Sequence, residues 1–318
     1  MAIANRGPLS SRLMRAFVRW FDSGVTSVAD EGGRSDGVDW ARIVPFVLMH
    51  AACLAVLWVG VSPIALITAG ALYLLRMFAI TGFYHRYFSH RSFKTTRVGQ
   101  FVFAVLGASA VQRGPIWWAA HHRHHHAHSD LRDDVHSPVQ RGFLWSHMGW
   151  FLSKRYFAPD LSRVRDLLRF PELRLLDRFD ILVPIALAVG LFGLGAWLER
   201  AAPELGTSAW QMLVWGFFVS TVACYHATYT INSLSHRFGR QRYATGDESR
   251  NNFWLALITL GEGWHNNHHH YPAAARQGFY WWEVDITYYL LKLLAMTGLI
   301  WDLKPVPAAI REGRGRRG

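Results

Sequence analysis

Histidine spacing is the feature of this sequence with the clearest chemical meaning. The 318-residue chain holds 17 histidines, and regular spacings occur in HRYFSH (85–90), HRHHH (122–126) and HNNHH (265–269). Positions i, i+3 and i+4 of a helix share one face, so each HxxHH motif directs three imidazoles the same way. Imidazole is a ligand for iron, zinc, copper and nickel. Two such faces and the HxxxxH pair predict a site for two metal ions.

A fourth motif supports this interpretation. NSLSH (232–236) repeats the i, i+4 spacing with Asn232 and His236. The chain lacks the pair of Glu-x-x-His motifs that soluble di-iron carboxylate bundles carry, which argues against that class. The run HHRHHHAH alone would also fit a metal-buffering tract. Such a tract would not explain why histidines elsewhere in the chain follow the same spacing.

The remaining histidines have no ligand spacing. His50 and His226 lie alone in apolar stretches, where a packing role is the usual one. The histidines that flank the motifs are expected to support the ligands or to face solvent; they are His121, His124, His128 and His270.

Apolar residues are bunched into stretches long enough to cross a hydrocarbon core of about 30 Å. These stretches are residues 43–61, 63–83, 181–198 and 208–228. They predict four transmembrane helices arranged as two hairpins, with large polar blocks at 84–180 and 229–303. Residues 98–112 are apolar but short for a span, so we expect a buried or interfacial helix there. Arg76 lies inside the second stretch, and its long side chain is expected to extend to the membrane surface.

Charge indicates how the chain is oriented. The net charge is +12, but the two connections within the hairpins carry one arginine between them, Arg200. Basic residues therefore gather on one side, which places both termini and the polar blocks in the cytoplasm. This distribution favours an integral, multi-pass membrane protein over a nucleic-acid-binding one. The excess of arginine over lysine indicates a bacterial source, so the expected location is the inner membrane.

The ends and the cysteines add further limits. Residues 1–40 form a basic cytoplasmic arm without a signal peptide, and within it residues 12–21 alternate basic and apolar positions, as either a membrane-surface helix or an ordinary amphipathic helix would. Residues 304–318 are expected to be a basic disordered tail. Cys53 and Cys224 both lie in expected spans, so they build neither a disulfide framework nor an iron–sulfur site.

Six motifs in this order resemble the membrane fatty acyl desaturases of the delta-nine type, which include stearoyl-CoA desaturases and their cyanobacterial and plant homologues. The motifs cover about residues 64–303, and the resemblance is to the whole desaturase domain, expected over 41–303. They are HRYFSHRSFK (85–94), GPIWWAAHHRHHHAHSD (114–130), RGFLWSHMGW (141–150), NSLSHRFG (232–239), GEGWHNNHHHYP (261–272) and QGFYWWEVDIT (277–287).

The resemblance implies an all-α membrane fold, with a stem of four transmembrane helices under a helical cytoplasmic cap that holds two iron ions. Asn232 would reach a metal through water. The implied metal ligands are His85, His90, His122, His125, His126, His236, His265, His268 and His269.

The implied reaction inserts a cis double bond, at the delta-nine position, into a long saturated acyl chain. An unactivated methylene has no acidic proton, so general acid–base catalysis cannot do this, and an oxidant made from dioxygen at the metal pair is required. Two electrons must come from a separate donor of the ferredoxin, rubredoxin or cytochrome b5 type with its reductase, because the chain has no HPGG motif or cysteine cluster. A related membrane di-iron hydroxylase and a non-catalytic metal-binding membrane protein are the alternatives.

The resemblance also suggests substrate contacts. Tyr73 and Met77 match the closed end of the acyl tunnel, and Gln112 and Trp118 match residues that line it. Lys154 and Arg155 match basic residues that contact coenzyme A, so acyl-CoA is the expected substrate. The Arg-Asp pair that precedes the second histidine motif in animal enzymes is Ala120-His121 here, which leaves an acyl lipid or acyl carrier as the alternative.

Overall fold

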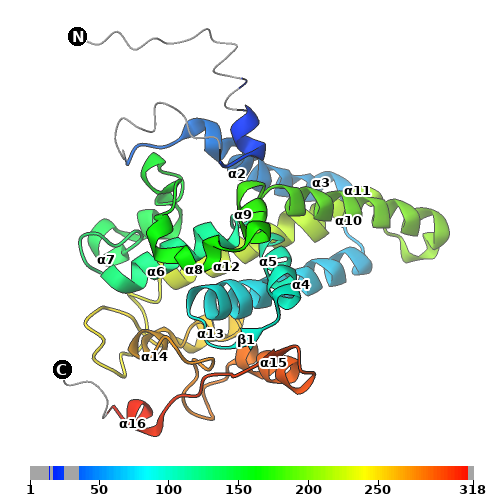
Figure 1. Cartoon of the computed structure of the whole chain (residues 1–318). Helices are drawn as coiled ribbons and strands as arrows, with labels where there is room; N and C mark the ends of the chain where they lie inside the picture. The colour runs from blue at the N-terminus through cyan, green and yellow to red at the C-terminus, as the bar shows by residue number, and fades with distance from the viewer. Residues whose placement is uncertain (1–13, 15–16, 25–35, 314–318) are drawn as a thin grey trace, which may run out of the picture.

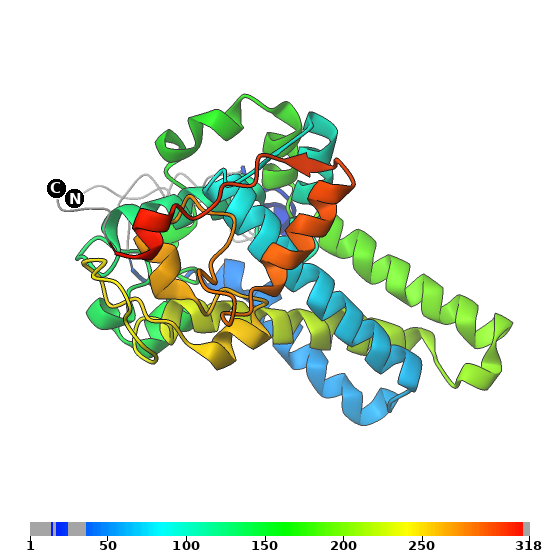
Figure 2. The same cartoon turned by 90° about the horizontal axis from the view of Figure 1, so that it is seen from below.

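The computed structural model describes residues 14, 17–24 and 36–313. Within these residues the chain is mostly helical. Its long helices project from one side of a body of shorter helices (Figures 1 and 2). We call the helices of residues 40–78 and 182–233 the stem, and the rest of the described chain from residue 79 the cap.

The first hairpin of the stem is built around a tight turn. It consists of α2 (Trp40–Ala52), η2 (Cys53–Ala55), α3 (Val56–Val59) and α4 (Pro63–Phe78). Gly60 takes the left-handed conformation, φ 68°, that a residue with a Cβ rarely adopts. Ser62 then caps α4 by accepting a hydrogen bond from the Ala65 amide at 3.2 Å, and Pro63 occupies the first helical turn.

The second hairpin is formed by α10 (Leu182–Ala201), η7 (Pro203–Leu205), α11 (Ala209–Gln211), η8 (Met212–Val219) and α12 (Ser220–Ser233). A capping box of Ser208 and Gln211 starts its returning helix. The two hairpins are joined at their far ends, because Gln211 donates to the Val59 carbonyl at 2.9 Å and Trp215 donates to the Gly60 carbonyl at 2.8 Å.

Two helical stretches of the described residues are long and apolar enough to cross a membrane, Pro63–Ser89 and Leu182–Ala201. The stretch Ile43–Val59 is apolar but shorter, and the span expected at 208–228 lies within the helical run from α11 to α12. The four-span stem therefore stays a prediction. Exposed apolar side chains cover the stem: Leu57 and Trp58 are 76% and 78% exposed. Such surface is unfavourable in water at about 25 cal/mol per Å², which fits a lipid environment.

Arg76 does not reach for the membrane surface as the sequence suggested. Its side chain is fully buried and its guanidinium bonds with Ser220 and Thr221 on α12. A buried guanidinium needs several acceptors, and the carbonyls of Leu72 and Gly216 supply more. The arginine thus ties α4 to α12 inside the stem.

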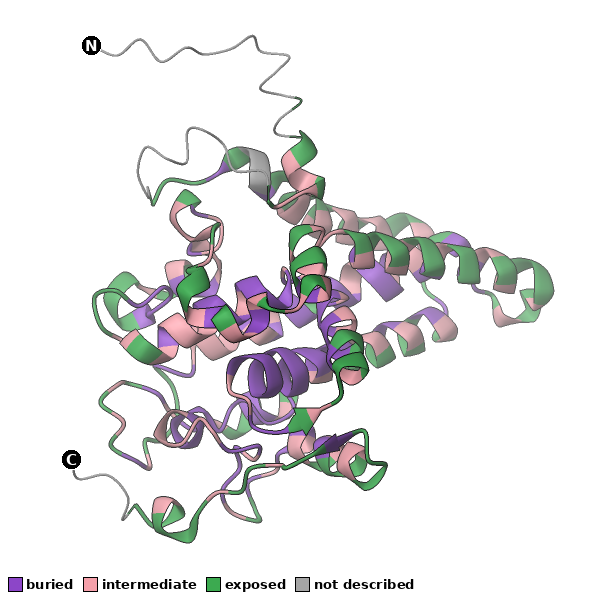
Figure 3. Cartoon of the chain, in the orientation of Figure 1, coloured by how far each residue is buried: buried purple, intermediate pink, exposed green. Residues whose placement is uncertain are grey.

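The cap surrounds the end of α4, which continues as the wide π-helical segment η3 (Ala79–Ser89). Its core includes Phe83 of η3, stacked on Phe103 with ring centroids 3.8 Å apart, and Figure 3 shows that η3 is buried throughout. The other cap elements are β1 (Lys94–Thr95), α5 (Arg97–Ala108), α6 (Pro115–His128), α7 (Pro138–Arg141), η4 (Trp145–Gly149), η5 (Lys154–Tyr156), η6 (Leu161–Val164), α8 (Arg165–Leu168), α9 (Pro171–Arg178), α13 (Phe253–Ile258), α14 (His265–His270), α15 (Ile286–Met296), β2 (Ile300–Trp301) and α16 (Ala308–Arg311).

The C-terminal segment folds back over the cap. Strands β1 and β2 pair antiparallel, with Lys94 opposite Trp301 and Thr95 opposite Ile300. The stretch 304–318 was expected to be disordered, but its described part contains α16, and the Arg311 carbonyl accepts a hydrogen bond from Tyr243 at 2.7 Å. These contacts order the segment as far as residue 313, and residues 314–318 lie outside the description.

Candidate metal centre

Nine histidines of the cap meet in two adjacent groups. Within each group the nitrogen atoms that face one another all lie within 4.8 Å. The five-histidine group contains His85, His90, His122, His126 and His268, and the four-histidine group contains His125, His236, His265 and His269. The structure thus brings together all nine histidines that the sequence singled out as ligands.

Each HxxHH helix divides its imidazoles between the two groups. Helix α6 gives His122 and His126, one turn apart, to the five-histidine group and His125 to the four-histidine group. Helix α14 gives His268 to the five-histidine group and gives His265 and His269 to the four-histidine group. The helix face that each motif shares is therefore wide enough to supply imidazoles to both of the neighbouring groups.

The wide helix η3 positions the first pair. Its last turn is π-helical, with the His90 amide donating to the His85 carbonyl at 3.2 Å. The two imidazoles are thereby turned toward the other motifs: His85 Nε2 lies 3.0 Å from His268 Nε2, and His90 Nε2 lies 2.7 Å from His122 Nε2. Arg123 fixes α6 against this segment by donating to the Phe88 carbonyl at 2.7 Å.

Four of the nine imidazoles have a carboxylate next to their Nδ1 atom. Glu262 Oε2 lies 2.5 Å from His85 Nδ1, and aspartates accept from Nδ1 of His125, His236 and His269. A carboxylate in this position fixes the tautomer of a metal-binding histidine and turns its Nε2 lone pair toward the ion. The partners are Asp134 for His125 at 2.9 Å, Asp130 for His236 at 2.7 Å and Asp247 for His269 at 2.6 Å.

Histidine spacing does not predict these carboxylates. Asp130 and Asp134 follow the second histidine motif closely and Glu262 precedes the third by three residues, so proximity could have singled them out. Asp247 lies in the loop between α12 and α13, and no spacing connects it with His269. Only the fold places it there.

Protonation of the groups suits metal binding. Burial lowers the pKa of His126 and His268 well below the usual value, so both are neutral and able to bind a cation at pH 7. Burial alone would raise the pKa of Asp247, but hydrogen bonds from His269, Ser249 and Thr245 outweigh it and hold the carboxyl ionised. His126 and His268 are thus neutral donors, and Asp247 is an anion next to His269.

Two orphaned nitrogens provide a direct test of fit. His125 Nε2 and His269 Nε2 are buried and have no hydrogen-bond partner. Both belong to the four-histidine group, and leaving buried polar atoms unpaired is unfavourable unless another partner takes their place. The donor set and these atoms fit two transition-metal ions.

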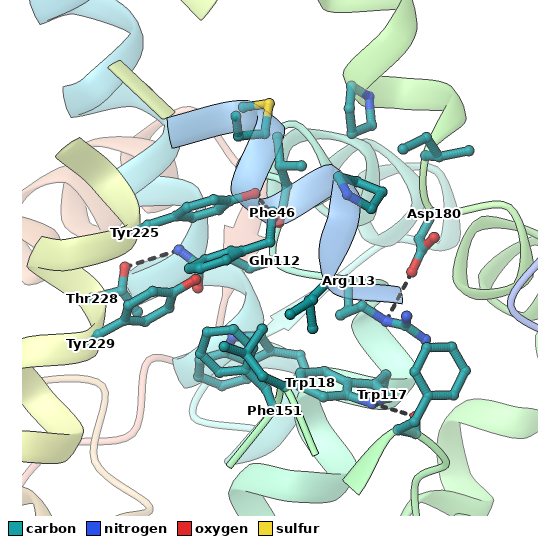
Figure 4. Close-up of a pocket in the computed structure, with 18 of the residues that line it drawn as sticks. Phe46, Gln112, Arg113, Trp117, Trp118, Phe151, Asp180, Tyr225, Thr228 and Tyr229 are labelled. Carbon is teal, nitrogen blue, oxygen red and sulfur yellow. Dashed lines mark hydrogen bonds and ion pairs between the residues drawn. The ribbon is translucent and has the colours of Figure 1, made fainter. Parts of the chain in front are cut away.

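An apolar cavity of about 740 Å³ adjoins the five-histidine group and is lined by His122. Figure 4 shows aromatic side chains around it, among them Phe46, Trp118 and Tyr229. A second, small cavity of about 50 Å³, the inner cavity, is lined by His85, His122 and Met77. Both cavities share Trp118, His122, Thr228 and Asn232, so they lie next to each other beside the histidine groups.

The substrate residues expected from the sequence separate into two sets. Gln112 and Trp118 line the large cavity, and Gln112 donates to Thr228 at 3.0 Å across it (Figure 4). Met77 lines the inner cavity, whereas Tyr73 lies one turn earlier on α4 and donates to the Ile258 carbonyl at 2.5 Å.

Lys154 and Arg155 line neither cavity. Arg155 lies 3.5 Å from Asp36, a carboxylate that Arg141 also contacts at 3.0 Å. The neighbouring Ser153 and Leu152 do line the large cavity, which places the two basic residues near it but not on its wall.

The histidines without ligand spacing join neither group. His50 and His226, expected to be packing residues, bond to each other through Nε2 atoms 3.2 Å apart, and His226 also bonds to His147 at 3.0 Å. Among the flanking histidines, His121 lines the large cavity, and the others bond to backbone carbonyls. These are His124, His128 and His270.

Comparison with known proteins agrees with this site. Residues 41–300 match the family model "Fatty acid desaturase". The chain is 36% identical over 276 residues to the sn-1 stearoyl-lipid 9-desaturase of Anabaena variabilis, covering 84% of this chain and 94% of the relative. It is 36% identical over 305 residues to the enzyme of the same name from Synechocystis sp., covering 93% and 89%.

A further relative has a different specificity. The acyl-CoA 5-desaturase AL21 of Anemone leveillei is 35% identical over 239 residues, which cover 74% of this chain and 70% of the relative. Relatives of this similarity share the reaction type but differ in the carrier and in the bond that is oxidised. The chain belongs to the fatty acid desaturase family and is a membrane fatty acid desaturase with histidine groups able to hold metal.

Proposed function

We propose that this protein is a delta-nine-type desaturase that inserts a cis double bond into a long saturated acyl chain carried by a membrane lipid. Its cofactor is a pair of iron ions, and it uses dioxygen and two electrons from a separate donor. The observation that carries the proposal is the apolar cavity that runs past His122 of the five-histidine group.

The nine histidines would hold the two ions, with Asn232 reaching one of them through water. Bound iron would supply an oxidant, made from dioxygen, that is able to remove two hydrogens from adjacent unactivated carbons. The protein itself selects the carbons by holding the chain in place. Thr228, which lines both cavities, accepts a hydrogen bond from Gln112 of the large cavity, and in this proposal the pair helps to hold the acyl chain in place.

The inner cavity sets the chain length in this proposal. A methyl end that passes the metal centre would meet Met77, and then Tyr73 one turn further along α4. The Tyr73 hydroxyl is tied to α13 through the Ile258 carbonyl, so the ring is held in place.

Two features favour a lipid carrier over the acyl-CoA that the sequence suggested. The large cavity is lined by Leu48 of α2 and Ile185 of α10, which are apolar and 58% and 40% exposed. These exposed lining residues support an opening of the cavity toward the lipid-facing surface of the proposed stem. Arg113 in the cavity wall pairs with Asp180 at 3.0 Å, so it does not offer an unbalanced charge to the phosphates of coenzyme A.

The proposed placement is integral to a bacterial inner membrane, with four spans and both termini in the cytoplasm. The exposed apolar surface of both hairpins supports this, as does the position of the cap on one side of them (Figure 2). The cap would then lie in the cytoplasm, where soluble electron donors are found.

The carrier can be tested with iron-loaded protein in liposomes, a ferredoxin and its reductase. We expect ¹³C-stearoyl phospholipid to be desaturated at least about tenfold faster than stearoyl-CoA. The variant Lys154→Ala should change the rate on lipid less than about twofold. A faster reaction on stearoyl-CoA that Lys154→Ala slows would reassign the carrier. Hydroxylated chains without alkenes would reassign the reaction.

A further inference from the structure

The two histidine groups differ in how many of their imidazoles contact a carboxylate. In the four-histidine group three imidazoles donate to an aspartate: His125 to Asp134, His236 to Asp130 and His269 to Asp247. In the five-histidine group only His85 has a carboxylate partner, Glu262. Among the described residues no other carboxylate forms an ion pair with a histidine of either group.

The balance of charge makes the difference larger. Glu262 also pairs at 3.1 Å with the buried guanidinium of Arg86, which it shares with Asp285, so its negative charge is partly compensated. In the described part of the chain neither lysine nor arginine pairs with Asp130, Asp134 or Asp247. Three aspartates that pair with no lysine or arginine of the described residues thus contact the four-histidine group, whereas the one carboxylate that contacts the five-histidine group has a share of Arg86.

These aspartates are also held rigidly. Asp130 accepts from Ser137 at 2.5 Å and from the Glu248 amide at 2.8 Å, and Asp247 accepts from Ser249 at 2.5 Å. Asp134 accepts from the Asp130 amide at 2.8 Å. Ordered acceptors keep the imidazoles in the orientation that a metal requires, so little ordering remains to be done when the ion binds.

We propose that the two metal positions are unequal, and that the four-histidine group binds its ion more tightly, fills first and empties last. An imidazole that donates Nδ1–H to a carboxylate is a more basic ligand at Nε2, and partners of this kind contribute about 10-fold to 100-fold each in metal affinity. The five-histidine group has one more imidazole. We therefore expect the negative charge next to the four-histidine group to raise its metal affinity more than the extra imidazole raises that of the five-histidine group. It rests on the proposed metal pair but not on the proposed substrate.

Release of iron to a chelator tests this without measuring turnover. Purified protein with two ferrous ions is mixed anaerobically with excess ferrozine, and the coloured complex is followed over time. We expect two phases of one ion each, with the slow phase at least about tenfold slower. Asp247→Asn should accelerate the slow phase about tenfold and leave the fast phase unchanged.

Matched variants assign the phases. Asp134→Asn should repeat the effect of Asp247→Asn, and Glu262→Gln should act on the fast phase only. Thermal unfolding of the metal-free proteins checks that each variant folds. A single phase that releases both ions, or an aspartate variant that accelerates only the fast phase, would overturn the inference. A protein that binds no iron would instead overturn the metal pair of the proposed function.

Discussion

Each metal position takes its imidazoles from several segments of the chain. The five-histidine group combines η3 and the residue after it with α6 and α14, and the four-histidine group combines α6, α14 and the turn after α12. Losing one imidazole therefore opens one position without removing any element from the fold. This separates the chemistry of the site from the stability of the membrane protein.

For this reason His122→Ala and His268→Ala are expected to abolish turnover, by at least about 100-fold, while leaving membrane insertion intact. His128→Ala is the matched control, because His128 lies on the same helix α6, bonds only to the His124 carbonyl and belongs to neither group. Product formation in isolated membranes is the measurement, normalised to the amount of protein. Normal product from either ligand variant would contradict the assignment.

If the proposed acyl path ends at Tyr73, which lines neither cavity, Tyr73→Ala is expected to lengthen the accepted chain. The ring lies one turn beyond Met77, and its removal would extend the inner cavity along α4. Competition between acyl chains of 16, 18 and 20 carbons measures the effect, with a shift of at least about threefold toward the longest. An unchanged profile would exclude Tyr73 from the end of the path.

Histidine spacing predicted which imidazoles meet, because i, i+3 and i+4 positions lie on one helix face. It did not predict how they divide, since that depends on where η3 and α14 sit relative to α6. The aspartates were missed for a related reason. Asp247 reaches His269 only because the loop after α12 folds back over α14, which no local pattern records.

Among the elements, α6, like α14, supplies imidazoles to both groups, so its position must be fixed accurately. Its first turn is held by Asp177 of α9, which accepts from the Ile116 amide at 3.0 Å and the Trp117 amide at 2.8 Å. Gly114 precedes this turn, and a Cβ there would collide with the backbone of Asp177. The close approach of α9 therefore requires glycine at this position.

Asp177 also predicts a pH effect. Burial raises the pKa of this carboxyl to about 6 from an unfolded value near 3.8, so ionisation is less favourable in the folded state. The folded state consequently loses stability as the pH rises from about 4 to about 6, by at most about 3 kcal/mol.

Asp177→Asn keeps an oxygen acceptor and removes the charge. We expect the melting temperature of the variant, minus that of the wild type, to increase between pH 4 and pH 7. Thermal unfolding in detergent at several pH values gives this difference. If the difference stays flat across that range, Asp177 does not titrate as described.

Helix positions were predictable from apolar runs, and their details were not. The helix that contains the expected span 63–83 continues through η3 to Ser89 and carries His85. A polar histidine and an arginine at 85 and 86 look like the end of a span, yet both are buried in the cap. Arg86 is neutralised there by Glu262 and Asp285, partners that only the fold brings near.

At the scale of the whole molecule, the surface of the stem suits lipid, whereas the cap suits water. In the apolar stretch of α10 that could span a membrane, only 17% of the residues are buried, whereas the η3 segment of the cap is buried throughout. The large cavity joins the two parts, since α2 and α10 of the stem and α6 of the cap all line it. In the proposed function, this cavity would be the route of the acyl chain from the lipid-facing surface of the stem to the metal pair.

The most direct test of the central claim is product analysis in a host that lacks its own desaturase but supplies an electron donor. Membrane lipids from cells expressing the wild type and His268→Ala are converted to methyl esters, and double bonds are mapped by mass spectrometry. We predict cis-9 monounsaturated chains with the wild type and none with the variant. Saturated lipids alone from cells whose membranes contain the iron-loaded wild type would contradict the account.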